Sequence, residues 1–248
     1  VRTEAFVQWL AHKTFEVYGL GNRIPAVYDI LLLTDNNVGF TMKEFTDCRL
    51  CSNFIAESVS VEKDIFHLLG QVAILLQILE DTLHLDHRDL KASNILICHE
   101  PSRLSYTCMV NGTLKHSIFH SPFTVVLVDF GFACMGDVLT GLTAIDAGEG
   151  AFPPLDPCPK EGRDIFQLIA SLYSVDSIRN KLSPAMVQQF HTWLELEKTD
   201  CQGVVKKWSY TELMYLLTSL KSFKHASCTP RAILDEVRKY DPSAFQSL

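Results

Sequence analysis

Residues 87–97 read HRDLKASNILI, a cluster of polar residues followed directly by an apolar run. The polar part places a carboxylate, an ammonium group and an amide at short fixed offsets. The apolar part is typical of a strand, so the polar side chains are expected on a loop that a strand anchors. The alternative is a buried ion-pair turn formed by the first three residues alone.

A second apolar run has the same relation to an acidic residue. Residues 125–128 read VVLV and lead into Asp129-Phe130-Gly131. Strands that end next to one another bring the acids at their ends to one place. Sites for a metal ion and phosphate groups are commonly built in this way.

Together, these motifs resemble those of the protein kinase family, whose catalytic loop reads H-R-D-L-K-x-x-N and whose metal motif reads D-F-G. The resemblance implies that Asp89 accepts or orients the proton of a substrate hydroxyl and that Lys91 steadies the transferred phosphoryl group. Lysine two positions after the aspartate resembles the serine/threonine branch. The implied reaction is phosphoryl transfer from ATP, with magnesium, to serine or threonine hydroxyls of a protein. The implied metal ligands are Asn94 and Asp129, with His87, Arg88 and Gly131 as supporting residues.

Composition restricts the class of protein. The chain has 248 residues, of which 47% are hydrophobic, enough for a large core in one domain or two small lobes. Gln77, Glu80 and Asp81 interrupt the longest apolar stretch, so no membrane span is expected. The net charge of −7 argues against a nucleic-acid-binding surface. We therefore expect a soluble globular protein. The protein substrate is implied only by the kinase resemblance.

The eight cysteines are scattered along the chain, which favours reduced thiols and an intracellular, cytoplasmic protein. Cys48 and Cys51 form a C-x-x-C pair. The pair could be half of a zinc site, a redox pair or two thiols one turn apart on a short helix.

Residues 1–45 resemble the second half of a kinase N-lobe with its hinge. Helical periodicity covers residues 3–18, and strands are expected over residues 26–33 and 38–45. By the resemblance, Met42 lies at the back of a nucleotide pocket, although it could also be a plain core methionine. The backbone groups expected to face adenine belong to Lys43, Glu44 and Phe45.

The first strands of a complete kinase are missing from this sequence. It contains neither a G-x-G-x-x-G loop near its start nor a V-A-I-K strand, so we expect the sequence to be incomplete and to bind ATP weakly as given. The helix glutamate that would pair with the strand lysine is Glu4 or Glu16. Glu4 is preferred because it lies on the same side of the helix as Val7. A kinase-like scaffold that binds a protein partner is the alternative function.

Residues 46–248 are expected to form a mainly helical C-lobe. A short helix over residues 47–56 and a long buried helix over residues 61–85 precede the catalytic loop. Asn111-Gly112, between strands 105–110 and 113–118, predicts an added β-hairpin. Asn111 also fits a glycosylation acceptor. Such a hairpin is weakly similar to those of kinase-like proteins from large DNA viruses.

Residues 132–161 correspond to the activation segment of the family. Thr140 and Thr143 are candidate phosphate acceptors for pairing with Arg88. The usual A-P-E is absent, and residues 152–156 read FPPLD instead. Asp164 opens an apolar helix that resembles the D-x-W-S-x-G helix and would tie down the catalytic loop. It could otherwise be an ordinary acid at a helix start.

An all-helical end is expected after that segment, with helices over residues 184–197, 210–220 and 230–240. Trp193 and Trp208 are assigned to the core. The predicted fold class is α+β, kinase-like, with a partial β N-lobe, a mainly helical C-lobe and an added hairpin.

Overall fold

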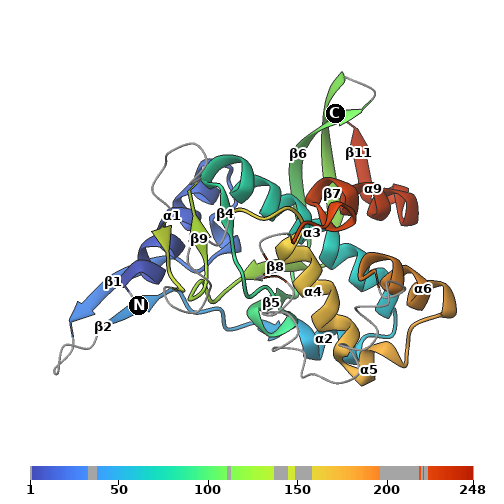
Figure 1. Cartoon of the computed structure of the whole chain (residues 1–248), viewed down its shortest axis with the longest axis horizontal. Coiled ribbons are helices and arrows are strands. Elements are labelled where there is room, and N and C mark those ends of the chain that lie inside the picture. The colour runs from blue at the N-terminus through green and yellow to red at the C-terminus, as the bar shows by residue number, and fades with distance from the viewer. Residues whose placement is uncertain are drawn as a thin grey trace.

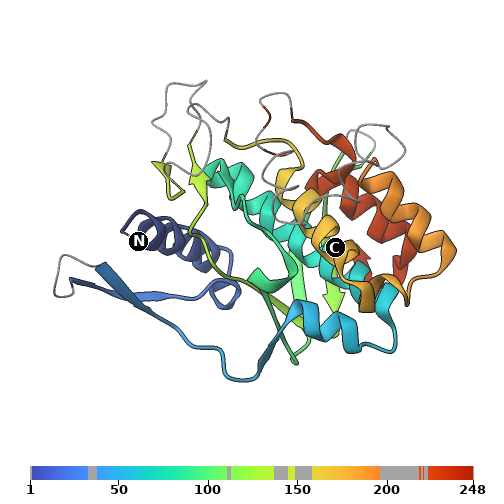
Figure 2. The same cartoon turned by 60° about the horizontal axis from the view of Figure 1, so that its bottom comes forward.

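The structure is a computed structural model that describes residues 2–32, 38–110, 113–136, 145–148, 158–195, 218, 220 and 223–247. These residues form a mixture of helices and small antiparallel sheets, which agrees with the α+β class. One helix and one hairpin lie at one end of the molecule, and most of the helices lie at the other (Figure 2). A single cluster of buried apolar side chains runs through both parts.

The first end is built from α1 (Arg2–Val17), the short turn η1 (Gly21–Arg23) and the hairpin of β1 (Val27–Leu32) and β2 (Val38–Met42). The bounds agree with the predicted helix and strands, except that β2 ends at Met42 rather than at residue 45. The predicted turn over residues 34–37 lies outside the described residues. Gln8 on α1 donates from Nε2 to the carbonyl oxygen of Pro25 at 3.0 Å, which fixes the hairpin against the helix.

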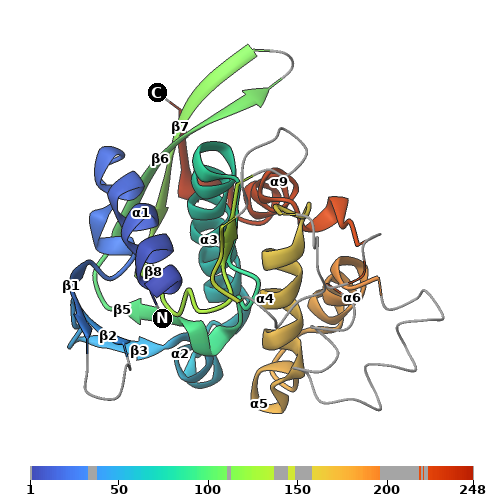
Figure 3. The same ribbon diagram turned by 60° about the vertical axis from the view of Figure 1, so that its left-hand side comes forward.

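The central element is α3 (Val61–Leu83), which packs against α9 (Pro230–Tyr240) (Figure 3). By length and composition α3 could cross a membrane, but 72% of its most apolar window is buried inside the protein, as in a core helix. The short helix predicted over residues 47–56 is partly wrong. Residues of β3 (Cys48–Leu50) pair with a neighbouring strand, and only α2 (Cys51–Glu57) is helical.

Two small sheets hold the polar loop. The first has the order β3–β5–β8, with β5 (Ile95–Cys98) antiparallel to β8 (Thr124–Leu127). The second has the order β10–β9–β4, from β10 (Ile145–Asp146), β9 (Cys134–Met135) and β4 (Leu85–Asp86). The loop of residues 87–94 leaves the second sheet and enters the first.

The predicted hairpin exists and is longer than expected, from β6 (Ser102–Val110) and β7 (Thr113–Ser121) (Figure 1). Asn111 and Gly112 themselves lie outside the described residues, so the turn and the glycosylation alternative stay predictions. Arg23 anchors the hairpin base because its Nη2 donates to Ser102 Oγ at 2.7 Å and its Nη1 to Gln71 Oε1 at 3.1 Å.

The predicted all-helical end is wrong in one respect. After α9 and the turn η6 (Pro242–Ala244), β11 (Phe245–Ser247) pairs with β7 and extends the hairpin to a three-stranded sheet. Phe245 packs against Phe119 of β7 at a ring-centroid distance of 5.0 Å, so the end of the chain gains apolar contacts by joining the sheet.

The remaining described helices are α4 (Arg163–Ser174), α5 (Asp176–Arg179) and α6 (Pro184–Trp193), with short turns η3 (Ala92–Asn94) and η5 (Ala226–Cys228). Trp193 is 1% exposed, which confirms its place in the core. Trp208 and most of the predicted helix over residues 210–220 lie outside the described residues.

The expectation of reduced cysteines is also wrong. Cys48 forms a disulfide with Cys98, and Cys134 forms one with Cys158. Cys51, the other half of the C-x-x-C pair, is a buried free thiol at the start of α2. Strand pairing explains this outcome, because Cys48 and Cys98 lie directly opposite one another in β3 and β5.

Candidate functional site

Within the polar loop, two side chains donate hydrogen bonds to Asp89. This carboxylate is 8% exposed, and its Oδ2 accepts from Lys91 Nζ at 2.7 Å and from Asn94 Nδ2 at 3.1 Å. Asn94 Nδ2 also donates to the carbonyl oxygen of Asp89 at 3.0 Å. The structure therefore brings together the three side chains that the sequence pattern named. The Asp89 carboxylate lies between the ammonium group of Lys91 and the amide group of Asn94 and accepts a hydrogen bond from each.

Two backbone contacts join this loop to the segment that carries Asp129. Val128 N donates to the carbonyl oxygen of Asn94 at 3.1 Å, and the His87 ring nitrogen Nε2 lies 3.0 Å from the carbonyl oxygen of Val128. The His87 ring also packs against Phe130, with 4.9 Å between ring centroids. Burial lowers the pKa of His87, which keeps the ring neutral between its apolar and backbone neighbours.

Both acidic segments include a strained backbone position. Arg88 has φ of 63° and Asp129 has φ of 67°, a left-handed conformation that residues with a Cβ rarely adopt. Such a position costs about 1–3 kcal/mol and persists only where surrounding contacts hold it. Gly131 N donates to Asp129 Oδ1 at 3.3 Å, which is one of these contacts.

No known family model and no curated protein matches this chain. The chemistry of the site is therefore argued from its own geometry. A buried carboxylate beside an ammonium group can orient a hydroxyl and stabilise charge on a transferred anionic group.

Asn94 and Asp129 are suited to a hard cation such as magnesium. Asp129 is exposed two residues after β8, and Asn94 stands immediately before β5, the neighbouring strand. Carboxylate and amide oxygens are the ligands such a cation prefers. A second group, Asp86 with Cys134 and Cys158, brings ligand atoms within 4.8 Å of one another. It is not a convincing metal site, because the cysteines form a disulfide and Arg163 Nε lies 3.1 Å from Asp86 Oδ2.

The two candidate helix glutamates lie in different surroundings. Glu4 faces the second motif, with its carboxyl carbon 3.8 Å from where a Cβ on Gly131 would stand. Burial, and then the nearby charge of Asp129, raise the pKa of Glu4. Glu16 is instead paired with Lys13 at 2.6 Å. The structure thus brings Glu4, and not Glu16, to the site.

The four residues predicted to contact a nucleotide base are the last residue of β2, Met42, and the three that follow it. Met42 is 47% exposed, so the plain-core alternative for this residue is wrong. Its sulfur lies 3.7 Å from Gln8 Nε2. Lys43 N donates to the carbonyl oxygen of Ala26 at 2.8 Å, and its ammonium group lies 4.9 Å from the centroid of the Phe45 ring. Glu44 is exposed. Their contact with a base stays a prediction.

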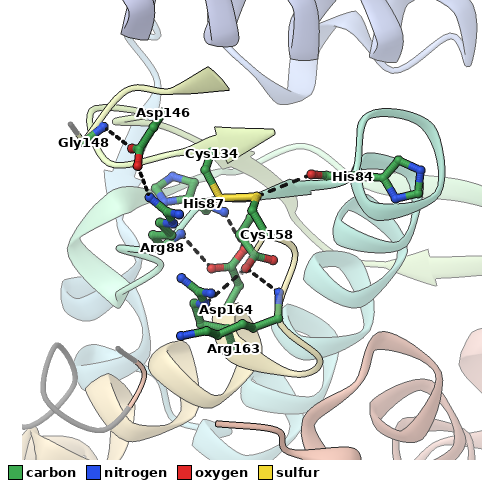
Figure 4. The surroundings of a disulfide bond; sticks show 11 residues. His84, His87, Arg88, Cys134, Asp146, Gly148, Cys158, Arg163 and Asp164 are labelled. Atoms are coloured by element: carbon green, nitrogen blue, oxygen red, sulfur yellow. Dashed lines mark hydrogen bonds and ion pairs between the residues drawn. A yellow bond between two sulfur atoms is a disulfide. The ribbon is translucent and has the colours of Figure 1, made fainter. Parts of the chain in front are cut away.

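Arg88 is engaged by a carboxylate in the structure. Its Nη1 lies 2.9 Å from Asp146 Oδ2, and Gly148 N in turn donates to Asp146 Oδ1 at 2.9 Å (Figure 4). The predicted acceptors Thr140 and Thr143 lie outside the described residues. Residues 152–156 lie outside them as well. Asp146 therefore supplies a negative charge in the place where a phosphate was expected.

Asp164 receives two backbone amides of the polar loop. His87 N donates to Asp164 Oδ2 at 2.7 Å and Arg88 N to Oδ1 at 2.8 Å (Figure 4). The carboxylate thus holds the two successive amides that lead into the strained Arg88 position, which an ordinary acid at a helix start would not do.

Two further side chains of α4 reach the same loop, and the sequence reasoning missed them. Gln167 accepts from Leu90 N at 3.2 Å and donates to the carbonyl oxygen of Arg88 at 2.8 Å. Ser171 Oγ accepts from Ala92 N at 2.9 Å. One sequence feature could have identified them. Gln167 and Ser171 lie three and seven positions after Asp164, which places all three on one side of a mainly apolar helix.

Proposed function

We propose that this chain carries the catalytic half of a protein-kinase-like fold, and that the intact protein transfers the γ-phosphoryl group of ATP, with magnesium, to serine or threonine hydroxyls of a protein. The observation that supports this most directly is the hydrogen-bonded set of Asp89, Lys91 and Asn94, joined through Val128 to Asp129. In phosphoryl transfer, positioning and charge stabilisation do most of the work.

Each group has a defined task in the proposed reaction. Asp89 orients the attacking hydroxyl and takes its proton, while Lys91 neutralises charge on the transferred group. Asn94 and Asp129 hold magnesium, which when bound screens the charges of the phosphates. Glu4 and Asp164 support the site, one facing Gly131 and the other holding the loop backbone. Residues 1–45 and 46–248 would be the partial N-lobe with hinge and the C-lobe.

The test is labelling of a generic protein substrate by the intact protein in the presence of ATP and magnesium. We expect Asp89→Asn to reduce labelling by at least about a hundredfold, because the amide cannot accept the hydroxyl proton. Asp81→Asn, an exposed acid near the end of α3, is the matched control and should leave labelling unchanged. Equal labelling by the wild type and Asp89→Asn would contradict the assignment.

A kinase-like binding protein is the second candidate function. Large apolar side chains are exposed on α1 and β1, including Trp9 at 41%, Tyr28 at 68% and Leu32 at 69%. Apolar surface of this kind is typical of protein contacts. Binding of a protein partner that is unaffected by Asp89→Asn, without labelling by the wild type, would favour this function.

A further inference from the structure

One face of α4 presents three polar side chains to the polar loop. Asp164, Gln167 and Ser171 follow one another at spacings of three and four, which places them on one side of a helix. All three are buried, at 4%, 2% and 5% exposure. Burial of these groups is offset by the hydrogen bonds that they make and, for Asp164, also by the nearby charges of Arg163 and Arg88.

The contacts run in order along the loop backbone. Asp164 receives the amides of residues 87 and 88, Gln167 receives that of Leu90, and Ser171 receives that of Ala92. The Gln167 amide group also donates to the carbonyl oxygen of Arg88. The helix therefore holds the backbone immediately before and after Asp89.

The hydrogen bonds from α4 include the backbone groups of the residue with the strained conformation, Arg88. Arg88 adopts a positive φ, and both of its backbone polar groups bond to α4, the amide to Asp164 and the carbonyl to Gln167. A strained conformation persists where its surroundings over-determine it. Without Gln167, the peptide that joins Arg88 to Asp89 would lose the contact that fixes its orientation.

We propose that Gln167 and Ser171 are positioning residues, which set the direction of the Asp89 carboxylate by holding the backbone on both sides of it. The proposal rests on the proposed phosphoryl transfer for its kinetic consequence. Neither side chain touches the reacting groups. Their effect is on the geometry of Asp89 and Lys91, so the turnover number should change while nucleotide affinity stays nearly constant.

Two serines of α4 provide a matched comparison. Ser171 Oγ donates to the carbonyl oxygen of Leu168 at 2.7 Å, and Ser174 Oγ donates to that of Ser171 at 2.8 Å. Both serines make the same bond within the helix, but Ser171 also accepts from the amide of Ala92. Ser174→Ala therefore controls for the loss of a helix hydroxyl.

The experiment measures kcat and the KM for ATP of Gln167→Met, Ser171→Ala and Ser174→Ala, together with amide exchange at Leu90 and Ala92. We expect kcat to fall roughly tenfold to a hundredfold for Gln167→Met, because small displacements of a reacting group have effects of that size. Ser171→Ala should show a smaller fall, Ser174→Ala none, and KM should change less than twofold. Exchange should accelerate at Leu90 in the first variant and at Ala92 in the second.

Equal kcat for Ser171→Ala and Ser174→Ala, with unchanged exchange at Leu90 and Ala92, would overturn the proposal. Ser171→Ala keeps it testable if Gln167→Met does not fold. If the wild type transfers no phosphoryl group, the proposed function fails on its own. Amide exchange then still decides whether these side chains hold the loop.

Discussion

At the residue scale, Glu80 near the end of α3 is a side chain whose ionised form is destabilised by its surroundings in the folded protein. Burial, and then the charges of Asp86 and Asp164, raise the pKa of Glu80 to about 8. The group therefore keeps its proton in the folded protein at pH values where the unfolded chain has lost it. Its contribution to stability is complete below the ordinary glutamate pKa and is lost as the pH rises through about 8.

Glu80→Gln should remove this pH dependence, because glutamine resembles the protonated acid and does not ionise. We expect the variant to be more stable than the wild type by roughly 4 kcal/mol at pH 8 and about equally stable near pH 4.5. Urea unfolding across this pH range measures the difference. Glu44→Gln, at an exposed position, is the control. A constant difference between Glu80→Gln and the wild type at all pH values would contradict the explanation.

The polar residues of the site were largely predictable from the sequence, because their spacing is fixed by a short loop between two strands. Asp89, Lys91 and Asn94 are close together in the chain as well as in space. Gln167 and Ser171 lie about 77 and 79 residues away from the amides that they bind. No local pattern encodes that distance, so only the packing of α4 against the loop reveals them.

At the scale of elements, the contact between α3 and the hairpin depends on one glycine. A Cβ on Gly70 would stand 2.6 Å from Cζ of Phe119 and 3.0 Å and 3.1 Å from two other atoms of its ring. Phe119 on β7 is fully buried, so its ring has little room to move. The glycine is therefore explained by the close approach of a strand to the helix.

Gly70→Ala should destabilise the protein by about 1–3 kcal/mol, because overpacking outweighs the better helix propensity of alanine. Adding Phe119→Leu should restore part of that loss, since the smaller side chain leaves room for the new methyl group. Thermal unfolding of the two single variants and the double variant gives the coupling between the positions. Additive effects of the two substitutions would contradict the predicted clash.

The helices and strands differ in how well the periodicity of apolar residues predicts them. The long helix and the first helix have strong repeating patterns, and their predicted bounds lie close to the observed ones. The hairpin was predicted from its turn residues, and each of its strands is three residues longer than expected. The strands β3 and β11 were missed, because each is only three residues long and exists through pairing with a distant strand. Such pairing is a tertiary effect that local composition does not report.

At the scale of the whole molecule, one disulfide links the two sides of the site. Cys134 lies in β9, five residues after Asp129, and Cys158 lies just before α4, which carries Asp164. Both cysteines are buried. The bond therefore ties the segment after the second motif to the helix that holds the polar loop. Scattered cysteines gave no sign of this pairing, because partners are set by the fold and not by spacing.

Removal of this bond by Cys134→Ser with Cys158→Ser should lower the free energy of unfolding by about 3 kcal/mol. The two cysteines are 24 residues apart, and a cross-link that closes a loop of this size restricts the unfolded chain by about that amount. Urea unfolding without reductant should show the difference. Cys228→Ala, which removes a buried free thiol, is the control and should cost about 1 kcal/mol.

The same comparison in the presence of a dithiol reductant separates the bond from the packing of the sulfur atoms. Reduction opens the cross-link in the wild type, so the stability of the wild type should fall toward that of the double variant. A difference of about 3 kcal/mol that persists after full reduction would show that the variant loses packing rather than a covalent link. Loss of the difference would show that the stability of the segment around the site depends on the oxidation state of the protein's surroundings, because disulfides persist only where thiols are not kept reduced.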